Sequence, residues 1–178
     1  MIASLTNSMG TAFWMVYHVF SDPIVLEECR AEAEKLVQLD DNGVQTIDLA
    51  KIRSSCPVLF STWAGDSVIY AHWRRGEGVS PDEKRKTPFT FRPFGGGTVL
   101  CPGRHFVTAG VLSFVILLLL RFDLKPAIKD GRWLELRKKM SMTAAMPVPK
   151  DEMPVKLAPR NTQKGPVNIS TIGGKLFY

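Results

Sequence analysis

The sequence predicts a mainly α-helical domain with a small β-hairpin near its C-terminal end. Residues 2–20 are largely apolar, and residues 24–39 alternate apolar and charged side chains at helical spacing. A second apolar run covers residues 107–122. Residues 133–145 and 153–157 flank a proline-containing turn, a pattern typical of two paired strands. The order of these segments predicts that helices form most of the domain and that strands follow them.

Composition and charge favour one ordinary soluble domain. Of the 178 residues, 45% are hydrophobic and 22% are charged, which is the usual balance for such a domain. The net charge of +6 suits contact with anionic lipid or with an acidic redox partner. No nucleic-acid-binding motif accompanies the basic residues, so we expect no nucleic-acid partner. Three widely separated cysteines favour a reducing compartment over a disulfide framework.

The boundary between the first two helices is marked by Pro23. Proline ends a helix that precedes it and suits the first turn of a helix that follows. Ser21 or Asp22 is placed to cap this second helix. Within the second helix, Glu27 and Arg30 stand three residues apart, and we interpret them as a surface pair.

Shorter elements are expected after the second helix. Residues 40–43 form a predicted turn, and Asp48 is expected to cap a short helix over 49–55. Another helix is expected over 57–63. Residues 65–90 are polar, charged and glycine-containing, with little apolar surface to bury, so we expect irregular chain there.

A glycine-rich segment leads into a single cysteine before the second apolar run. The segment runs from Phe94 to Cys101 and contains three consecutive glycines. Cys101 is therefore expected at the start of a buried helix over 104–121, where loop amides and the helix dipole favour a thiolate. Gly97 and Gly103 would let a flat partner approach the sulfur, and Phe94 would close one side of the pocket.

Three other interpretations of Cys101 stay open from the residues alone. The cysteine could belong to the core beneath a glycine-rich turn. It could join His105 and His72 around zinc, although a structural zinc site needs four ligands. It could also be a reactive thiol at a helix start. We favour ligation of a flat cofactor over each of these.

The spacing Phe-x-x-Gly-x-x-x-Cys-x-Gly, at Phe94, Gly97, Cys101 and Gly103, resembles the haem-binding loop of the cytochrome P450 superfamily. The resemblance implies a partial cytochrome P450 fold in which the Cys101 thiolate is the axial ligand of haem iron. We therefore expect haem as the cofactor.

Two arginines near this loop are candidates to contact the haem propionates. Arg92 and Arg104 each offer a forked donor that suits a carboxylate. Val99 stands where many members of the family carry a basic residue for this task. Either arginine could instead be a surface cation.

The first helix resembles the family's distal helix, which crosses the haem face opposite the cysteine. On that comparison, Thr6 takes the place of the family's acid and Asn7 that of its threonine. This pattern is closer to the branch with prostacyclin synthase and certain sterol hydroxylases. Thr6 and Asn7 are therefore catalytic candidates; the alternative is a polar patch in a helix that merely packs.

The resemblance covers only the C-terminal portion of the family's domain. We expect residues 1–160 to form that portion and residues 161–178 to be a disordered tail. The family's N-terminal half and the segment around its Glu-x-x-Arg helix have no counterpart in this sequence. Glu27 and Arg30 match those letters but lie in the wrong helix, and the interval from Trp63 to Cys101 is shorter than the family's.

The activity that the resemblance implies is that of a haem-thiolate monooxygenase. Such an enzyme inserts one oxygen atom from O2 into a substrate, here a small apolar organic molecule, with electrons from an NADPH-dependent reductase. The family also implies an intracellular protein at the endoplasmic reticulum membrane, held there by an upstream anchor. The sequence shows no signal peptide and no uninterrupted apolar run of membrane length. Two alternatives are a haem-thiolate isomerase, suggested by Asn7, and a truncated, non-catalytic fragment that cannot hold haem.

Overall fold

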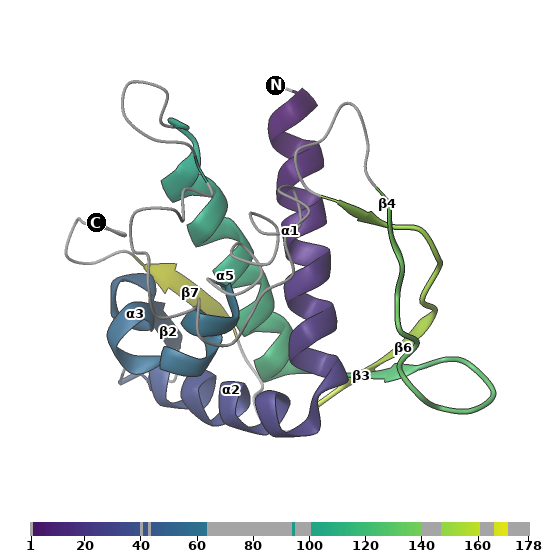
Figure 1. Ribbon diagram of the computed structural model, residues 1–178. Helices are drawn as coiled ribbons and strands as arrows, with labels where there is room; N and C mark the ends of the chain where they lie inside the picture. The colour runs from purple at the N-terminus through teal and green to yellow at the C-terminus, as the bar shows by residue number, and fades with distance from the viewer. Residues whose placement is uncertain are drawn as a thin grey trace, which may run out of the picture.

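Three helices form the centre of the molecule. The computed structural model describes residues 2–39, 41–42, 44–63, 94, 101–139, 147–160 and 166–170, with side chains in the first helix from Asn7 onward. Helices α1 (Ile2–Ser21) and α5 (Arg104–Arg121) lie side by side, and α2 (Pro23–Leu36) crosses beneath both (Figure 1). The mainly helical fold that the sequence predicts is confirmed.

The turn between α1 and α2 follows the predicted capping pattern. The Asp22 carboxylate accepts hydrogen bonds from the backbone N–H groups of Ile24 at 2.9 Å and Val25 at 3.3 Å. Pro23 occupies the first turn of α2, where its missing N–H costs nothing. Helix α2 ends at Leu36, three residues before the predicted end, because the chain turns extended and begins a strand.

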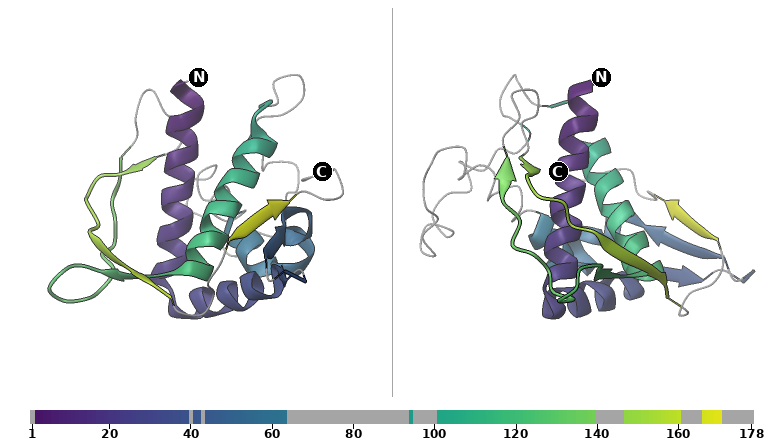
Figure 2. Two further views of the ribbon diagram at one scale, coloured as in Figure 1. Left: turned by 180° about the vertical axis from the view of Figure 1, so that it is seen from behind. Right: turned by 90° about the vertical axis from the view of Figure 1, so that its right-hand side faces the viewer.

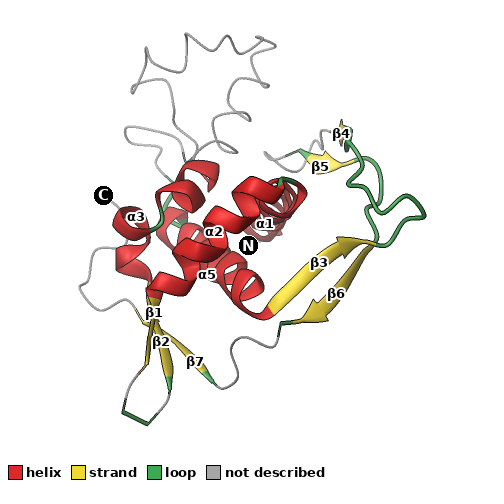
Figure 3. Ribbon diagram, turned by 90° about the horizontal axis from the view of Figure 1, so that it is seen from below, coloured by secondary structure: helices red, strands yellow, loops and turns green. Residues whose placement is uncertain are grey.

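A three-stranded sheet joins segments that are distant in sequence. Strand β1 (Val37–Leu39) pairs antiparallel with β2 (Gln45–Asp48), and β2 pairs in parallel with β7 (Val167–Ser170). Figure 3 shows this sheet on one side of the helices. This sheet is not predicted from the sequence, and residues 167–170, which belong to the predicted disordered tail, form a strand instead. Val167 packs against the hydrophobic core, which fixes the strand.

The remaining strands form two antiparallel pairs (Figure 2). Strand β3 (Phe122–Pro126) pairs with β6 (Val155–Pro159), and β4 (Lys138–Lys139) pairs with β5 (Val148–Pro149). The small C-terminal hairpin is therefore β4–β5, shorter than predicted. The predicted pairing of 133–145 with 153–157 is wrong, because β3 continues directly from α5 and offers β6 a longer partner.

The short helical segments that follow β2 match the prediction. A 3₁₀ turn, η1 (Leu49–Lys51), leads into α3 (Ile52–Ser55), and residues 57–63 are helical. The Asp48 carboxylate accepts a hydrogen bond from Ala50 N–H at 3.0 Å, as the predicted cap requires. The predicted irregular segment, residues 65–90, lies outside the described residues.

The core lies where α5 meets α1 and α2. Each fully buried aliphatic side chain there contributes about 1.5–3 kcal/mol. On α5 the buried apolar side chains are Val111, Leu112, Val115, Ile116, Leu119 and Leu120. The prediction that α5 is buried all round is wrong on one face, since Phe106 is 81% exposed and Phe114 is 49% exposed.

Among the described helices, α5 alone has the length and apolar composition of a membrane span, a test that core helices also pass. Its uninterrupted apolar run is shorter, which is why the sequence alone predicts no segment of membrane length.

Two arginines tie the helices to the strands. Arg30 contacts the Asp123 carboxylate and donates to the Phe122 carbonyl at 3.1 Å. Arg160 donates to the Leu119 carbonyl at 2.6 Å. The predicted Glu27–Arg30 pair is therefore replaced by a contact from α2 to β3, which fixes the end of α5.

Candidate functional site

The three cysteines lie in two different surroundings. Cys29 and Cys56 are fully buried, whereas Cys101 is exposed just before α5. Burial, followed by the nearby Glu32 carboxylate, raises the pKa of both Cys29 and Cys56 to about 12. These two thiols are therefore protonated at neutral pH. The interpretation of Cys101 as a core cysteine is wrong, and Cys101 is the thiol open to a ligand.

The position of Cys101 is set by a hydrogen bond to Phe94. The Cys101 N–H donates to the Phe94 carbonyl at 2.8 Å. The Phe94 ring packs against the ring of Trp63, with centroids 6.4 Å apart and planes inclined by 32°. Phe94 thus joins Cys101 to the helical segment at 57–63, and its closing of a pocket stays a prediction.

The first turn of α5 begins directly after the cysteine. Gly103 precedes α5, and its carbonyl accepts from Val107 N–H at 2.9 Å. A Cβ at Gly103 would lie 3.8 Å from the Cys101 sulfur, an ordinary contact, so the described chain tolerates a side chain there. The Arg104 guanidinium donates to the Cys101 carbonyl at 3.2 Å. Arg104, predicted to contact a propionate, therefore braces the loop in this structure.

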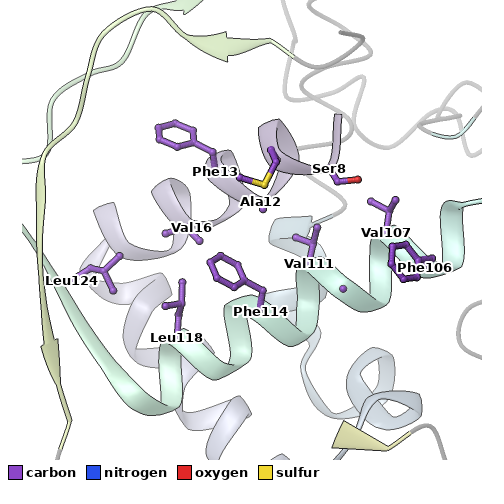
Figure 4. A pocket seen from close by; sticks show the side chains of 12 residues that line it. Ser8, Ala12, Phe13, Val16, Phe106, Val107, Val111, Phe114, Leu118 and Leu124 are labelled. Atoms are coloured by element: carbon purple, nitrogen blue, oxygen red, sulfur yellow. The ribbon is translucent and has the colours of Figure 1, made fainter. Parts of the chain in front are cut away.

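An apolar groove separates α1 from α5 (Figure 4). Its volume is about 580 Å³, within the roughly 300–1,000 Å³ typical of cofactor pockets. Ser8 is the polar side chain in a lining that is otherwise apolar or aromatic. On α5 the lining begins at Phe106, in the first turn after Cys101. The groove can hold a flat, largely apolar molecule between the two helices.

The two catalytic candidates belong to α1, one of the two helices that line this groove. Asn7 is half-buried, and its carbonyl accepts a hydrogen bond from the Thr11 hydroxyl at 2.8 Å. Asn7 directly precedes Ser8 of the groove lining. Thr6 belongs to α1, but its side chain lies outside the described residues. α1 and α5 therefore line one groove, and the cysteine precedes one of them.

Three of the residues predicted for the site lie outside the described residues. They are Arg92, a propionate candidate, Gly97, one of the loop glycines, and His72, a candidate zinc ligand. His105 lies half-buried in the first turn of α5. Within the described ranges, no three side chains of the metal-binding types gather to hold an ion. The zinc interpretation gains no support from these residues.

Sequence reasoning missed one charged residue of structural importance, Glu32. The helical spacing of residues 24–39 predicts Glu32 on the charged face of its helix, yet it is only 8% exposed. Its two carboxylate oxygens accept hydrogen bonds from Val58 N–H at 2.9 Å and Leu59 N–H at 3.0 Å. The available signal was its position three residues after Cys29 and next to Ala33, which places it at the edge of the apolar stripe.

Comparisons with known proteins find cytochrome P450 proteins and monooxygenases. A family model described as Cytochrome P450 matches residues 66–153. The chain is 25% identical to a cytochrome P450 monooxygenase of Gibberella zeae, with 72% of this chain and 34% of the relative aligned. It is 24% identical to the cytochrome P450 monooxygenase nodJ of Hypoxylon pulicicidum, with 92% and 43% aligned. A beta-amyrin 28-monooxygenase of Panax ginseng is 35% identical over 72 residues, with 40% and 13% aligned.

The lengths of these alignments carry further information. The alignments cover 34% of the Gibberella relative and 43% of the Hypoxylon relative, so the chain spans less than half of either protein. The alignment with the Hypoxylon protein covers 221 positions, although this chain has 178 residues. The relative therefore has residues within the aligned region that this chain lacks.

Proposed function

The chain belongs to the cytochrome P450 superfamily, and on that premise we propose that it forms the haem-ligating part of a haem-thiolate monooxygenase, with Cys101 as the axial ligand of the iron. One observation carries the proposal: Cys101 is exposed at the start of α5, while the other two cysteines are buried. A haem ligand must reach the iron as a thiolate, which favours the accessible sulfur over the buried ones.

We propose that the residues around Cys101 accommodate a flat macrocycle. Haem, when bound, supplies the chemistry of O2 activation, while the protein supplies the ligand, the orientation and a dry pocket. The apolar groove between α1 and α5 supports burial of such a group beside the cysteine loop. Phe94 holds the Cys101 backbone, and Gly97 and Gly103 are proposed to let the macrocycle approach.

Four polar residues are proposed to serve the edges of the site. Arg92 and Arg104 are the proposed partners of the haem propionates, and for Arg104 this role would add to its bond with the Cys101 carbonyl. On α1 we propose that Thr6 and Asn7 face the distal side. A hydroxyl can donate and accept, whereas an amide can orient a ligand but does not titrate. Asn7 is therefore assigned to orientation rather than to proton transfer, as the prostacyclin synthase-like pattern suggests.

The wider reaction is proposed from the family. Members generally oxidise organic substrates with electrons from a reductase, and two fungal relatives carry the name monooxygenase. We propose a small apolar substrate, a reductase that contacts the basic surface of the protein, and an endoplasmic reticulum location. Residues 1–160 are the proposed family portion of the chain.

Absorption spectroscopy tests the proposal. The purified chain is loaded with haem, reduced and exposed to carbon monoxide. We expect the red-shifted Soret band of thiolate ligation, lost in Cys101→Ala and kept in Cys29→Ala. Consumption of O2 and reductant by the loaded chain would then separate a monooxygenase from an isomerase.

A second candidate is a non-catalytic relative that does not hold haem by itself. It is favoured by the short coverage, since the chain aligns with only 34% and 43% of its two fungal relatives. In that case the loaded chain shows no thiolate band, or a band that Cys101→Ala leaves unchanged. Either result supports a non-catalytic relative and contradicts the haem-ligating role.

A further inference from the structure

We propose that Glu32 is a positioning residue for the Cys101 loop: its carboxylate fixes the start of the helical segment at 57–63, and that segment holds the loop through Trp63 and Phe94. The inference rests on the proposed function, because it treats Cys101 as the residue that must be positioned. The contacts that carry it involve only residues of this chain.

The first link runs from α2 to the segment at 57–63. The N–H groups of a first helical turn have no partner within their helix, and a carboxylate there is favoured by the helix dipole. Glu32 meets two of them, Val58 N–H at 2.9 Å and Leu59 N–H at 3.0 Å, while only 8% exposed. A buried carboxylate with two donors in fixed positions sets where the segment begins.

The second link is aromatic. Trp63 is the last described residue of the segment and is 6% exposed. It lies about one and a half turns after Val58, so a displaced helix start moves the ring. The ring of Phe94 packs on it with the centroids 6.4 Å apart. The segment and the loop are thereby joined.

The third link reaches the cysteine itself. The Phe94 carbonyl accepts the hydrogen bond from Cys101 N–H at 2.8 Å. Ring and carbonyl belong to one residue, so packing of the ring against Trp63 also restrains the acceptor. On its other side Cys101 is joined to α5 through Gly103. The sulfur is thus held between α5 and a chain of contacts that begins at Glu32.

Amide hydrogen exchange on the full chain without haem tests this chain of contacts. Glu32→Gln keeps one acceptor and sets an NH2 group against the second backbone donor. We expect exchange at Val58, Leu59 and Cys101 to quicken by about tenfold. The matched control is Glu34→Gln on the same helix, whose carboxylate contacts Arg160 at 3.4 Å and should leave these three amides unchanged.

A substitution in the middle of the chain of contacts gives an independent test. Trp63→Leu removes the ring that meets Phe94, so exchange at Cys101 should quicken while Val58 and Leu59 stay protected. Trp63→Phe keeps a ring and should preserve most of the protection at Cys101. This pair also tests the proposal if Glu32→Gln fails to fold.

The exchange results tell whether Glu32 positions Cys101 or only stabilises its own helix contacts. The haem-loaded samples test the proposed function separately. If Glu32→Gln quickens exchange at Val58 and Leu59 but not at Cys101, Glu32 only stabilises its helix and the inference is overturned. With haem loaded, we expect the thiolate Soret band to shrink in Glu32→Gln and to keep its size in Glu34→Gln. Absence of that band in the unsubstituted chain contradicts the proposed function but leaves the exchange result as the test of positioning.

Discussion

The region around Cys29 and Cys56 and the loop of Cys101 use the same side chain for opposite purposes. The first two thiols lie among apolar side chains beside the Glu32 carboxylate, so their charged form is disfavoured. Cys101 is exposed just before α5, and its N–H donates to the Phe94 carbonyl. The difference teaches that the fold, and not the residue type, decides which cysteine is available for chemistry.

The largest expected change in stability comes from a substitution on the buried face of α5, whereas one on its exposed face should change little. Leu119 is fully buried in the core, so Leu119→Ala should lower the free energy of unfolding by about 2–5 kcal/mol. Phe106 is 81% exposed beside the groove, so Phe106→Ala should change it by no more than about 0.5 kcal/mol. Urea denaturation of both variants measures the difference. Equal losses would show that the groove face is packed in solution.

The pH dependence of stability should reveal the buried thiols. Because their folded pKa of about 12 exceeds the ordinary 9.0, the unfolded chain releases these protons first as pH rises. Stability should therefore be intact below about pH 9 and fall between pH 9 and 12. Each thiol contributes at most about 1.4 kcal/mol per pH unit, and less where water reaches it. Denaturation at several pH values should give a flatter curve for the Cys29→Ala/Cys56→Ala double variant; an unchanged slope would contradict the burial.

A smaller effect is expected at the turn between α1 and α2. Asp22→Ala removes the acceptor for Ile24 and Val25 N–H, which should cost about 1 kcal/mol of unfolding free energy. Asp22→Ser supplies another good cap and should recover most of that loss. Thermal denaturation of the two variants checks the prediction. If Asp22→Ala and Asp22→Ser are equally stable, packing of the buried faces of α1 and α2 alone fixes the turn.

The smallest effect is expected at the surface pair of the C-terminal hairpin. The hydrogen bond from Arg137, together with its charge, lowers the pKa of Asp151. In Arg137→Gln the pKa of Asp151 should rise towards its ordinary value, which carbon-detected NMR titration of the carboxyl group would show. Because both groups lie in water, we expect no measurable change in stability. A clear loss of stability would make this pair a structural contact.

The helices and the position of Cys101 just before α5 could be predicted because their signals are local. Pro23 and Asp22 mark a helix boundary by their own chemistry, and the long apolar run after Cys101 predicts α5. The three-stranded sheet could not be predicted, because strands of three or four residues show no clear alternation and β7 pairs with a segment more than 100 residues away.

The exposed face of α5 and the role of Glu32 were missed for a related reason. A helix that is apolar all round gives no sign of which face is left open. Glu32 looked like a surface charge because its partners are backbone amides of a segment 26 residues away, which no spacing rule reports. Both features depend on tertiary contacts rather than on the residues themselves.

The most direct test of the central claim is alkylation of the three cysteines by iodoacetamide, mapped by mass spectrometry with and without added haem. Without haem, we expect Cys101 to react while Cys29 and Cys56 stay unmodified until the chain unfolds. Added haem should then protect Cys101 selectively. Modification of Cys101 at the same rate in both samples would contradict the claim that this sulfur binds the iron.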